Sequence, residues 1–140
     1  MGYGLPAAVA AKAVAPERTV LCWSGDGDFL MLGQELATAM QHELPILVVI
    51  ADNGMLGTIR MHQERQFPGR VVATDLVNPD FAAFAHAFGA HGENVTRTED
   101  FPAALERALG AGVASVIALK TDPDAITPRT TLTAMRAAAT

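Results

Sequence analysis

Two short segments combine glycines with oxygen-bearing side chains, the residue types that can hold a metal ion beside a phosphate. Residues 24–29 read Ser-Gly-Asp-Gly-Asp-Phe, and residues 51–57 read Ala-Asp-Asn-Gly-Met-Leu-Gly. Asp26 and Asp28 would repel a bare pyrophosphate, but a divalent cation lets carboxylate, amide and phosphate oxygens share one site. Because Mg²⁺ is usually held by one or two carboxylates together with substrate phosphates, Asp26 and Asn53 are candidate ligands for it.

Each segment also has an ordinary structural interpretation. Asp and Asn before Gly are frequent turn formers, so either segment alone would be interpreted as a turn. A functional site is favoured because both segments follow predicted strands. A helix is expected after the first segment, and its N-terminus would offer free backbone N–H groups to a phosphate.

Those strands belong to a regular alternation of strand and helix patterns. Short apolar runs predict strands over residues 19–23, 46–51 and 115–119. Apolar residues at helical spacing predict helices over residues 5–15, 29–43, 78–89 and 98–110. Asn78 is expected to cap the third of these helices, with Pro79 at its first position, and Thr98 is expected to cap the fourth.

This alternation predicts an α/β fold, with a mainly parallel sheet and helices on both faces. In such sheets ligands bind beyond the carboxyl ends of the strands, which is where the two glycine-containing segments fall. The chain is long enough for one domain over residues 1–140, in which residues 121–140 are expected to form a surface tail.

Composition excludes several classes of protein. Lys plus Arg is 10 and Asp plus Glu is 15, and the resulting net charge of -5 argues against a nucleic-acid partner. No apolar run is long enough to span a membrane, so no membrane partner is expected. Cys22 is the one cysteine, which excludes a disulfide framework and favours a reducing, cytoplasmic location. It lies in a predicted strand and is expected in the core rather than as a nucleophile.

A dinucleotide site of the Rossmann type is an alternative interpretation of the same residues. Gly25 and Gly27 fit the first two glycines of that fingerprint, and Asp52 after the next strand could bind a ribose. However, Leu30 stands where close helix packing needs a small residue. Asp26 would also face the pyrophosphate without a metal.

The two segments together resemble a known motif. Gly25-Asp26-Gly27, followed after 24 residues by Asp52-Asn53, resembles the metal and diphosphate motif of thiamine-diphosphate enzymes. In that family the motif consists of GDG, a spacer and NN, so Asp52 replaces the first Asn of the pair in this sequence. Residues 1–8, 34–36, 57–60 and 78–81 also resemble acetolactate synthases and related 2-oxo acid decarboxylases.

The resemblance implies a thiamine-diphosphate-binding fold and a set of ligands. It implies that Asp26 and Asn53 bind Mg²⁺ through their side chains, and Met55 through its backbone carbonyl. It also places Met1 beneath the cofactor, where it would enforce a V-shaped conformation. The cofactor-binding residues that follow from it are Met1, Gly25, Asp26, Gly27, Asp28, Asn53, Met55 and Leu56.

Some residues depart from the family or have a plainer interpretation. Asp28 stands where the family often has Ser, which adds charge beside the diphosphate. His62 stands where acetolactate synthases carry a Trp that favours 2-oxobutyrate as acceptor, so another decarboxylase or carboligase of the superfamily fits as well. Surface or solvated positions are expected for His42, His86, His91, Arg60, Glu64, Arg65 and Arg70.

The predicted function is that of a cofactor-binding domain, for thiamine diphosphate and Mg²⁺, in a 2-oxo acid decarboxylase or carboligase. In the family the activating Glu comes from a different domain on the partner subunit. Missing domains or a partner subunit and a homo-oligomer are therefore expected, and the chain alone is expected to be inactive. The family's first strand and helix should precede Met1, so the chain resembles a fragment. The alternative from another class is a non-catalytic interaction or assembly domain with the same fold.

Overall fold

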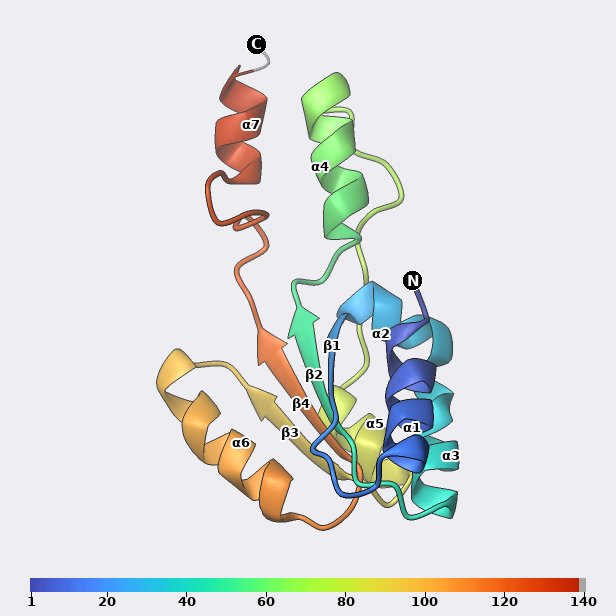
Figure 1. Cartoon of the computed structure of the whole chain (residues 1–140). Helices are drawn as coiled ribbons and strands as arrows, with labels where there is room; N and C mark the ends of the chain where they lie inside the picture. Colours follow the sequence, from blue (N-terminus) through green and yellow to red (C-terminus); the bar gives the residue numbers. More distant parts are fainter. Residues whose placement is uncertain (139–140) are drawn as a thin grey trace.

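The computed structural model describes residues 1–138, and it is built on a four-stranded sheet. The strands are β1 (Leu21–Gly25), β2 (Leu47–Asp52), β3 (His91–Val95) and β4 (Ser115–Lys120). They lie in the order β1-β2-β4-β3, and every pair is parallel. The carboxyl ends of β1, β2 and β4 therefore meet at one edge of the sheet (Figure 1).

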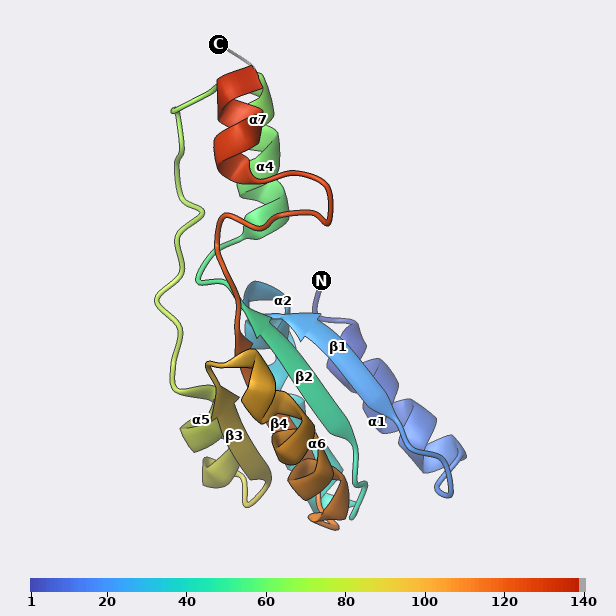
Figure 2. The same cartoon turned by 90° about the vertical axis from the view of Figure 1, so that its left-hand side faces the viewer.

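Helices and short 3₁₀ turns connect the strands. The α-helices are α1 (Gly4–Val14), α2 (Asp26–Leu32), α3 (Leu36–Gln41), α4 (Gly57–Gln66), α5 (Phe81–Ala87), α6 (Phe101–Gly110) and α7 (Leu132–Ala138). The 3₁₀ turns are η1 (Gly33–Glu35) and η2 (Thr98–Asp100). Helix α6 lies on one face of the sheet, and α1, α3 and α5 lie on the other (Figures 1 and 2).

Each face of the sheet has its own apolar core. Val48, Ile50 and Val116 point toward α1, α3 and α5, where Phe29 and Phe81 pack edge to face with ring centroids 5.7 Å apart. The opposite face has a smaller cluster under α6, formed by Leu47, Val49, Val95, Ala104, Ala108 and Ile117. Because strands β2 and β4 are buried on both faces, their sequences are continuous apolar runs. The predicted α/β fold with helices on both faces is confirmed.

The helix predicted over residues 29–43 is wrong as one continuous element. It is divided into α2, η1 and α3, and the break lies at Leu32, whose φ of -139° is not helical. Gly33 explains why the chain turns there. A Cβ at this position would lie 2.9 Å from the Phe29 ring, so the glycine lets the backbone pass directly over a core aromatic residue.

Both predicted helix caps are wrong. Helix α5 begins at Phe81, and its cap is Asp80, whose Oδ1 accepts hydrogen bonds from the backbone N–H groups of Ala82 and Ala83. Asn78 and Pro79 therefore precede the helix, and Asn78 makes other contacts. Thr98 begins the 3₁₀ turn η2 instead of capping α6.

Sequence reasoning missed three elements: β3, α4 and α7. Strand β3 reads His-Gly-Glu-Asn-Val, so only Gly92 and Val95 are buried and the apolar pattern is weak. Helices α4 and α7 stand side by side beyond the carboxyl ends of the strands (Figures 1 and 2). Residues 121–140, expected as a surface tail, thus include a helix that packs on α4; residues 139–140 lie outside the described part of the chain.

The face of β1 that points away from α1 is open. Leu21 and Trp23 point to that side and are 52% and 62% exposed, because α6 packs on β3 and β4 and, through Leu47 and Val49, on β2. Cys22 points the other way and is buried, as predicted. Within residues 1–138, no helix has the length and apolar character needed to cross a membrane.

Candidate cofactor site

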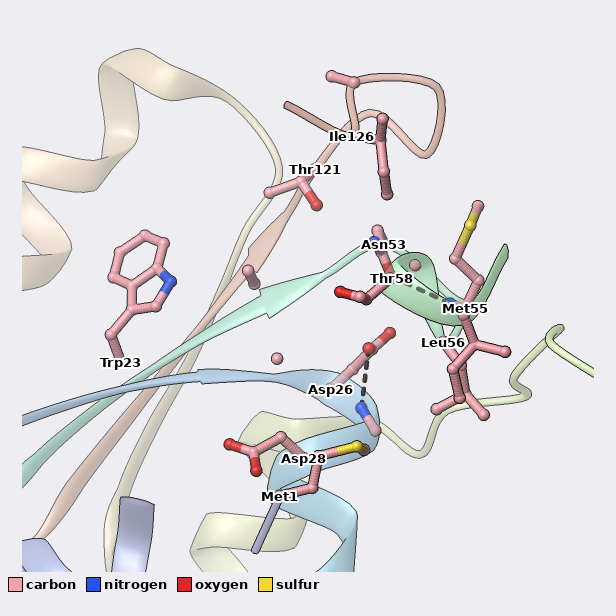
Figure 3. Close-up of a pocket in the computed structure, with 16 residues that line it drawn as sticks. Met1, Trp23, Asp26, Asp28, Asn53, Met55, Leu56, Thr58, Thr121 and Ile126 are labelled. Atoms are coloured by element: carbon pink, nitrogen blue, oxygen red, sulfur yellow. Dashed lines mark hydrogen bonds between the residues drawn. The ribbon is translucent and has the colours of Figure 1, made fainter. Parts of the chain in front are cut away.

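A cavity of about 590 Å³ lies at the carboxyl edge of the sheet, where the fold class places ligands. Its lower wall comes from the N-terminal residue and the β1–α2 junction, and its side comes from the β2–α4 loop (Figure 3). Thr121 and Ile126, which follow β4, lie above it in this view, and Ala125 also lines it. All eight residues predicted to contact the cofactor line this cavity: Met1, Gly25, Asp26, Gly27, Asp28, Asn53, Met55 and Leu56.

Asp26 is the buried carboxylate of the site, at 2% exposure. Its Oδ1 accepts a hydrogen bond from Gly27 N–H at 2.8 Å. Its Oδ2 accepts from Gly54 N–H at 2.8 Å and from Asn78 Nδ2 at 2.7 Å. All three donors are neutral, and no cationic side chain of residues 1–138 pairs with this carboxylate. A buried negative charge without a counter-ion is costly, so this arrangement is suited to receive a cation.

Asn53 approaches the same opening from the end of β2 (Figure 3). Its Oδ1 accepts a hydrogen bond from Met55 N–H at 3.1 Å, which folds the loop into a tight turn. Gly54 stands at the turn with a φ of +70°, a conformation that side chains disfavour. An amide oxygen has two lone pairs, so Asn53 Oδ1 keeps one for a further ligand.

The donor set fits a hard divalent cation. Within residues 1–138 no three or more His, Cys, Asp or Glu side chains gather to hold a metal. A site here must therefore use amide, carbonyl or phosphate oxygens beside the Asp26 carboxylate, which is the ligand chemistry that Mg²⁺ accepts.

The carboxylate of Asp28 is engaged by its own chain. Gly2 N–H donates to Oδ1 at 2.6 Å, and the Ser24 hydroxyl donates to Oδ2. These bonds fasten the N-terminal segment to the first turn of α2, and they place Met1 on the cavity wall. Asp28 also raises the pKa of Cys22, after the larger effect of burial, so this thiol is not activated as a nucleophile.

The two glycines of residues 24–29 have different surroundings. A Cβ at Gly27 would lie 2.6 Å from Leu56 Cδ2, so the absence of a side chain lets the two loops touch. A Cβ at Gly25 would meet no atom within 4 Å, because this residue borders the open cavity. A side chain at Gly27 would thus force Leu56 to move, whereas Gly25 borders open space.

Sequence reasoning missed Asn78 as a residue of this site. Its Nδ2 donates to Asp26 Oδ2 and also to Asp52 Oδ1, at 2.7 and 2.8 Å. The other oxygen of Asp52 lies 3.3 Å from Lys120 Nζ. The one sequence signal was the Asn-Pro-Asp run at residues 78–80, which reads equally well as a helix cap, and its true partners are 26 and 52 residues away.

Glu64 corrects another prediction, because it is buried rather than solvated. Its carboxylate accepts two hydrogen bonds from the Arg136 guanidinium and one from Gly69 N–H. The bonds from Arg136 lower the pKa of Glu64 to about 2, with a smaller contribution from Gly69. This pair joins α7 to α4, whose first residues Thr58 and Ile59 line the cavity.

The other titratable residues named above lie outside the cavity. The solvated position expected for Arg60 is wrong: its side chain is largely buried, because it donates to Thr74 Oγ1 and pairs with Asp75. His91 pairs with Glu93 on β3 at 2.8 Å and is only partly exposed, so its predicted surface position is only partly right. The side chains expected in solvent and found exposed are His42, Arg65, Arg70 and His86. His62, for which both a solvent-facing and a substrate-facing position were open, is exposed too.

Comparison with family models, with curated proteins and with solved structures finds similarity to thiamine-diphosphate enzymes in each case. Residues 1–119 match the family model described as thiamine pyrophosphate enzyme, C-terminal TPP binding domain. The acetolactate synthase isozyme 2 large subunit of Escherichia coli is 46% identical over 112 residues, which cover 79% of this chain and 20% of that protein. A putative thiamine pyrophosphate-containing protein of Bacillus subtilis is 46% identical over 110 residues, with coverage of 78% and 19%.

A solved structure agrees in fold. The thiamine diphosphate-dependent 4-hydroxybenzoylformate decarboxylase of Rhodococcus jostii RHA1 superposes with a TM-score of 0.82 at 33% identity. The match covers 87% of this chain and 23% of that one. The chain thus spans about a fifth of the length of the curated relatives that it matches. None of these comparisons supports the Rossmann alternative. By its sequence, its fold and the model that matches residues 1–119, the chain belongs to the C-terminal TPP-binding domain family of thiamine pyrophosphate enzymes.

Proposed function

We propose that this chain is the domain that binds thiamine diphosphate and Mg²⁺ in a 2-oxo acid decarboxylase or carboligase of the acetolactate synthase type. One observation carries the proposal: the Asp26 carboxylate is buried, forms no ion pair with residues 1–138, and lines a cavity together with the Asn53 amide. We further propose that residues 1–140 form this one domain. The proposed location is the cytoplasm, in keeping with a single, unpaired cysteine.

In this proposal the protein holds the cofactor rather than supplying acids or bases. Asp26 and Asn53 bind the Mg²⁺ through side-chain oxygens, and Met55 binds it through its carbonyl. Gly25 and Gly27 offer backbone beside the diphosphate, Asp28 fixes the N-terminal segment beneath it, and Met1 and Leu56 contact the rings. Once bound, thiamine diphosphate supplies the electron sink for loss of CO₂ from a 2-oxo acid.

The catalytic acid or base is expected from outside this chain. Buried carboxylates among residues 1–138 are Asp26 and Glu64, and both are engaged by other partners. The open face of β1, with Leu21 and Trp23, supports contact with missing domains or with a second copy of the chain. We therefore propose a larger enzyme, assembled as a homo-oligomer, and no turnover of pyruvate by the isolated chain.

The first experiment is a thiamine diphosphate titration with and without Mg²⁺, followed by Trp23 fluorescence. Trp23 lines the cavity, so a bound cofactor will change its emission. The expected result is a saturable change that requires Mg²⁺ and is lost in Asp26→Asn. The matched control, Glu17→Gln, removes the same charge from an exposed residue and should bind normally.

Other results would point elsewhere. Binding of NAD without a metal would restore the dinucleotide alternative. Self-association or partner binding by a folded sample that ignores the cofactor would favour an assembly domain. Circular dichroism of each variant will separate loss of binding from loss of the fold.

A further inference from the structure

The inference concerns how the Asp26 carboxylate is oriented, and it rests on the function proposed above. Asp26 follows β1 and Asp52 ends β2, and the register pairs Gly25 with Ala51 on these neighbouring parallel strands. The two carboxylates are therefore brought to adjacent strand ends, where like charges repel. The Asn78 amide lies between them and donates one hydrogen bond to each.

Asn78 does not serve the helix that follows it. Asp80 caps α5, so the Asn78 side chain is not needed there. Its Oδ1 is buried with no hydrogen-bond partner among the described residues, which is an unfavourable state for an amide oxygen. The role of Asn78 therefore lies in its NH₂ group, whose single nitrogen donates two hydrogen bonds without adding charge.

Counting lone pairs shows what the bridge does to Asp26. Its Oδ2 accepts from both Gly54 N–H and Asn78 Nδ2, which occupies both of its lone-pair directions. Its Oδ1 accepts from Gly27 N–H alone and keeps one direction open. Asp52 has the Lys120 ammonium group within 3.3 Å, whereas Asp26 has no ion pair with any side chain of residues 1–138.

We propose that Asn78 is a positioning residue for metal binding: it saturates Oδ2 of Asp26 and so presents Oδ1 to the cation. A neutral donor suits this role, because Lys or Arg at this position would neutralise Asp26 and compete with the metal. An Asp would add a third carboxylate. Partners that orient a metal ligand typically change metal affinity by about 10- to 100-fold when they are removed.

The test measures the Mg²⁺ concentration that gives half-maximal thiamine diphosphate binding, read by Trp23 fluorescence at saturating cofactor. Asn78→Ala is expected to raise this concentration at least about tenfold. Asn94→Ala is the matched control, because Asn94 also donates to a carboxylate, Asp80, at 2.6 Å but lies outside the cavity. It should stay within about twofold of the parent chain.

Two further measurements separate positioning from general support of the fold. Adding Asp52→Asn to Asn78→Ala removes the repulsion and supplies a new amide beside Asp26, so it should recover part of the lost Mg²⁺ affinity. With Mn²⁺ in place of Mg²⁺, the electron paramagnetic resonance spectrum of the bound ion should broaden in Asn78→Ala and narrow again in the double variant. Urea unfolding without ligands gives the stability of each variant.

The outcomes are distinct. A Mg²⁺ requirement in Asn78→Ala within twofold of the parent chain would overturn the inference. The inference would also be overturned by an equal loss in the double variant, with a Mn²⁺ spectrum that never changes. If the parent chain shows no metal-dependent binding, the proposed function itself fails, and the inference fails with it.

Discussion

Asp26 and Glu64 are the two carboxylates buried among the described residues, and they are satisfied in opposite ways. Asp26 lies at the sheet edge and accepts hydrogen bonds from backbone N–H groups and an amide. Glu64 lies on α4 and accepts from Arg136, which carries a full positive charge. One carboxylate keeps its charge uncompensated, and the other is neutralised by the chain itself.

The difference shows how burial of a charge can be interpreted. A buried carboxylate with its own guanidinium is a complete pair that fastens two elements together, here α4 and α7. A buried carboxylate with neutral donors is held in place but still needs a cation. Burial alone would have marked both residues as functional, whereas their hydrogen-bond donors separate a structural pair from a candidate ligand site.

The largest effect is expected from giving Asp26 a counter-ion of its own, as Glu64 has. Asn78→Lys would place an ammonium group beside the carboxylate. This group would compensate the negative charge of Asp26 and compete with Mg²⁺ for it. We expect the Mg²⁺ concentration for half-maximal cofactor binding to rise by about 100-fold, with no loss of stability in the absence of ligand. Asn94→Lys, next to Asp80, is the control for added charge, and retention of normal Mg²⁺ dependence in Asn78→Lys would refute the comparison.

A smaller effect is expected at Gly25, where the cavity is open. Gly25→Ala adds a methyl group that meets no protein atom within 4 Å, so the urea midpoint should not change. The same methyl group should weaken thiamine diphosphate binding by about tenfold, because it fills space that the ligand needs. Gly110→Ala is the matched control, since its Cβ would also meet nothing but lies far from the cavity. Equal affinity in both variants would show that the diphosphate lies elsewhere.

The Glu64–Arg136 pair should make the packing of α7 depend on pH. The folded-state pKa of Glu64 is lowered from 4.5 to about 2, so the pairing contributes fully above pH 4.5 and is lost as the pH falls toward 2. Amide exchange in α7, followed by NMR across this range, should accelerate in the parent chain.

Removing the guanidinium should abolish that pH dependence. In Arg136→Gln, α7 should exchange about tenfold faster already at neutral pH, with little further change on acidification. Arg129→Gln, on an exposed side chain before α7, should behave as the parent chain does. The same acid sensitivity in Arg136→Gln and the parent would mean that another group holds α7.

The smallest effect is expected on the outer side of α4. His62 is exposed and does not line the cavity, although the resemblance gave it a place near the substrate. His62→Trp should therefore leave cofactor binding within about twofold and the urea midpoint unchanged. A larger change in cofactor affinity would indicate that α4 rotates toward the cavity when the ligand binds.

The parts of the fold that the sequence predicted are those specified by local patterns. The strands of residues 46–51 and 115–119 are apolar runs that would be buried on both faces, and turn-forming residues follow the first of them. Because adjacent parallel strands end at the same edge, the Asp26 and Asn53 segments were expected to meet, and they line one cavity.

The missed parts depend on contacts between distant residues. Helix α4 is largely polar and has no apolar face that would predict it. It is held instead by polar contacts: Arg136 bonds Glu64, and the Gln63 side chain exchanges hydrogen bonds with the backbone of Val72. Asn78 looked like a cap because nothing nearby reveals a carboxylate 52 residues earlier in the chain. Which ligands complete the Mg²⁺ site is still a prediction.

The pairing of α4 with α7 has a consequence for the order in which the site is completed. During synthesis all four strands emerge before α7, so the sheet and the Asp26–Asn53 pair are present while α4 still lacks its partner. Until Arg136 arrives, Glu64 lacks its cationic partner, and α4 is held by contacts with residues 69–75, such as that between Gln63 and the Val72 backbone. The contact between α4 and α7 is therefore the last part of this edge of the molecule to form on a growing chain.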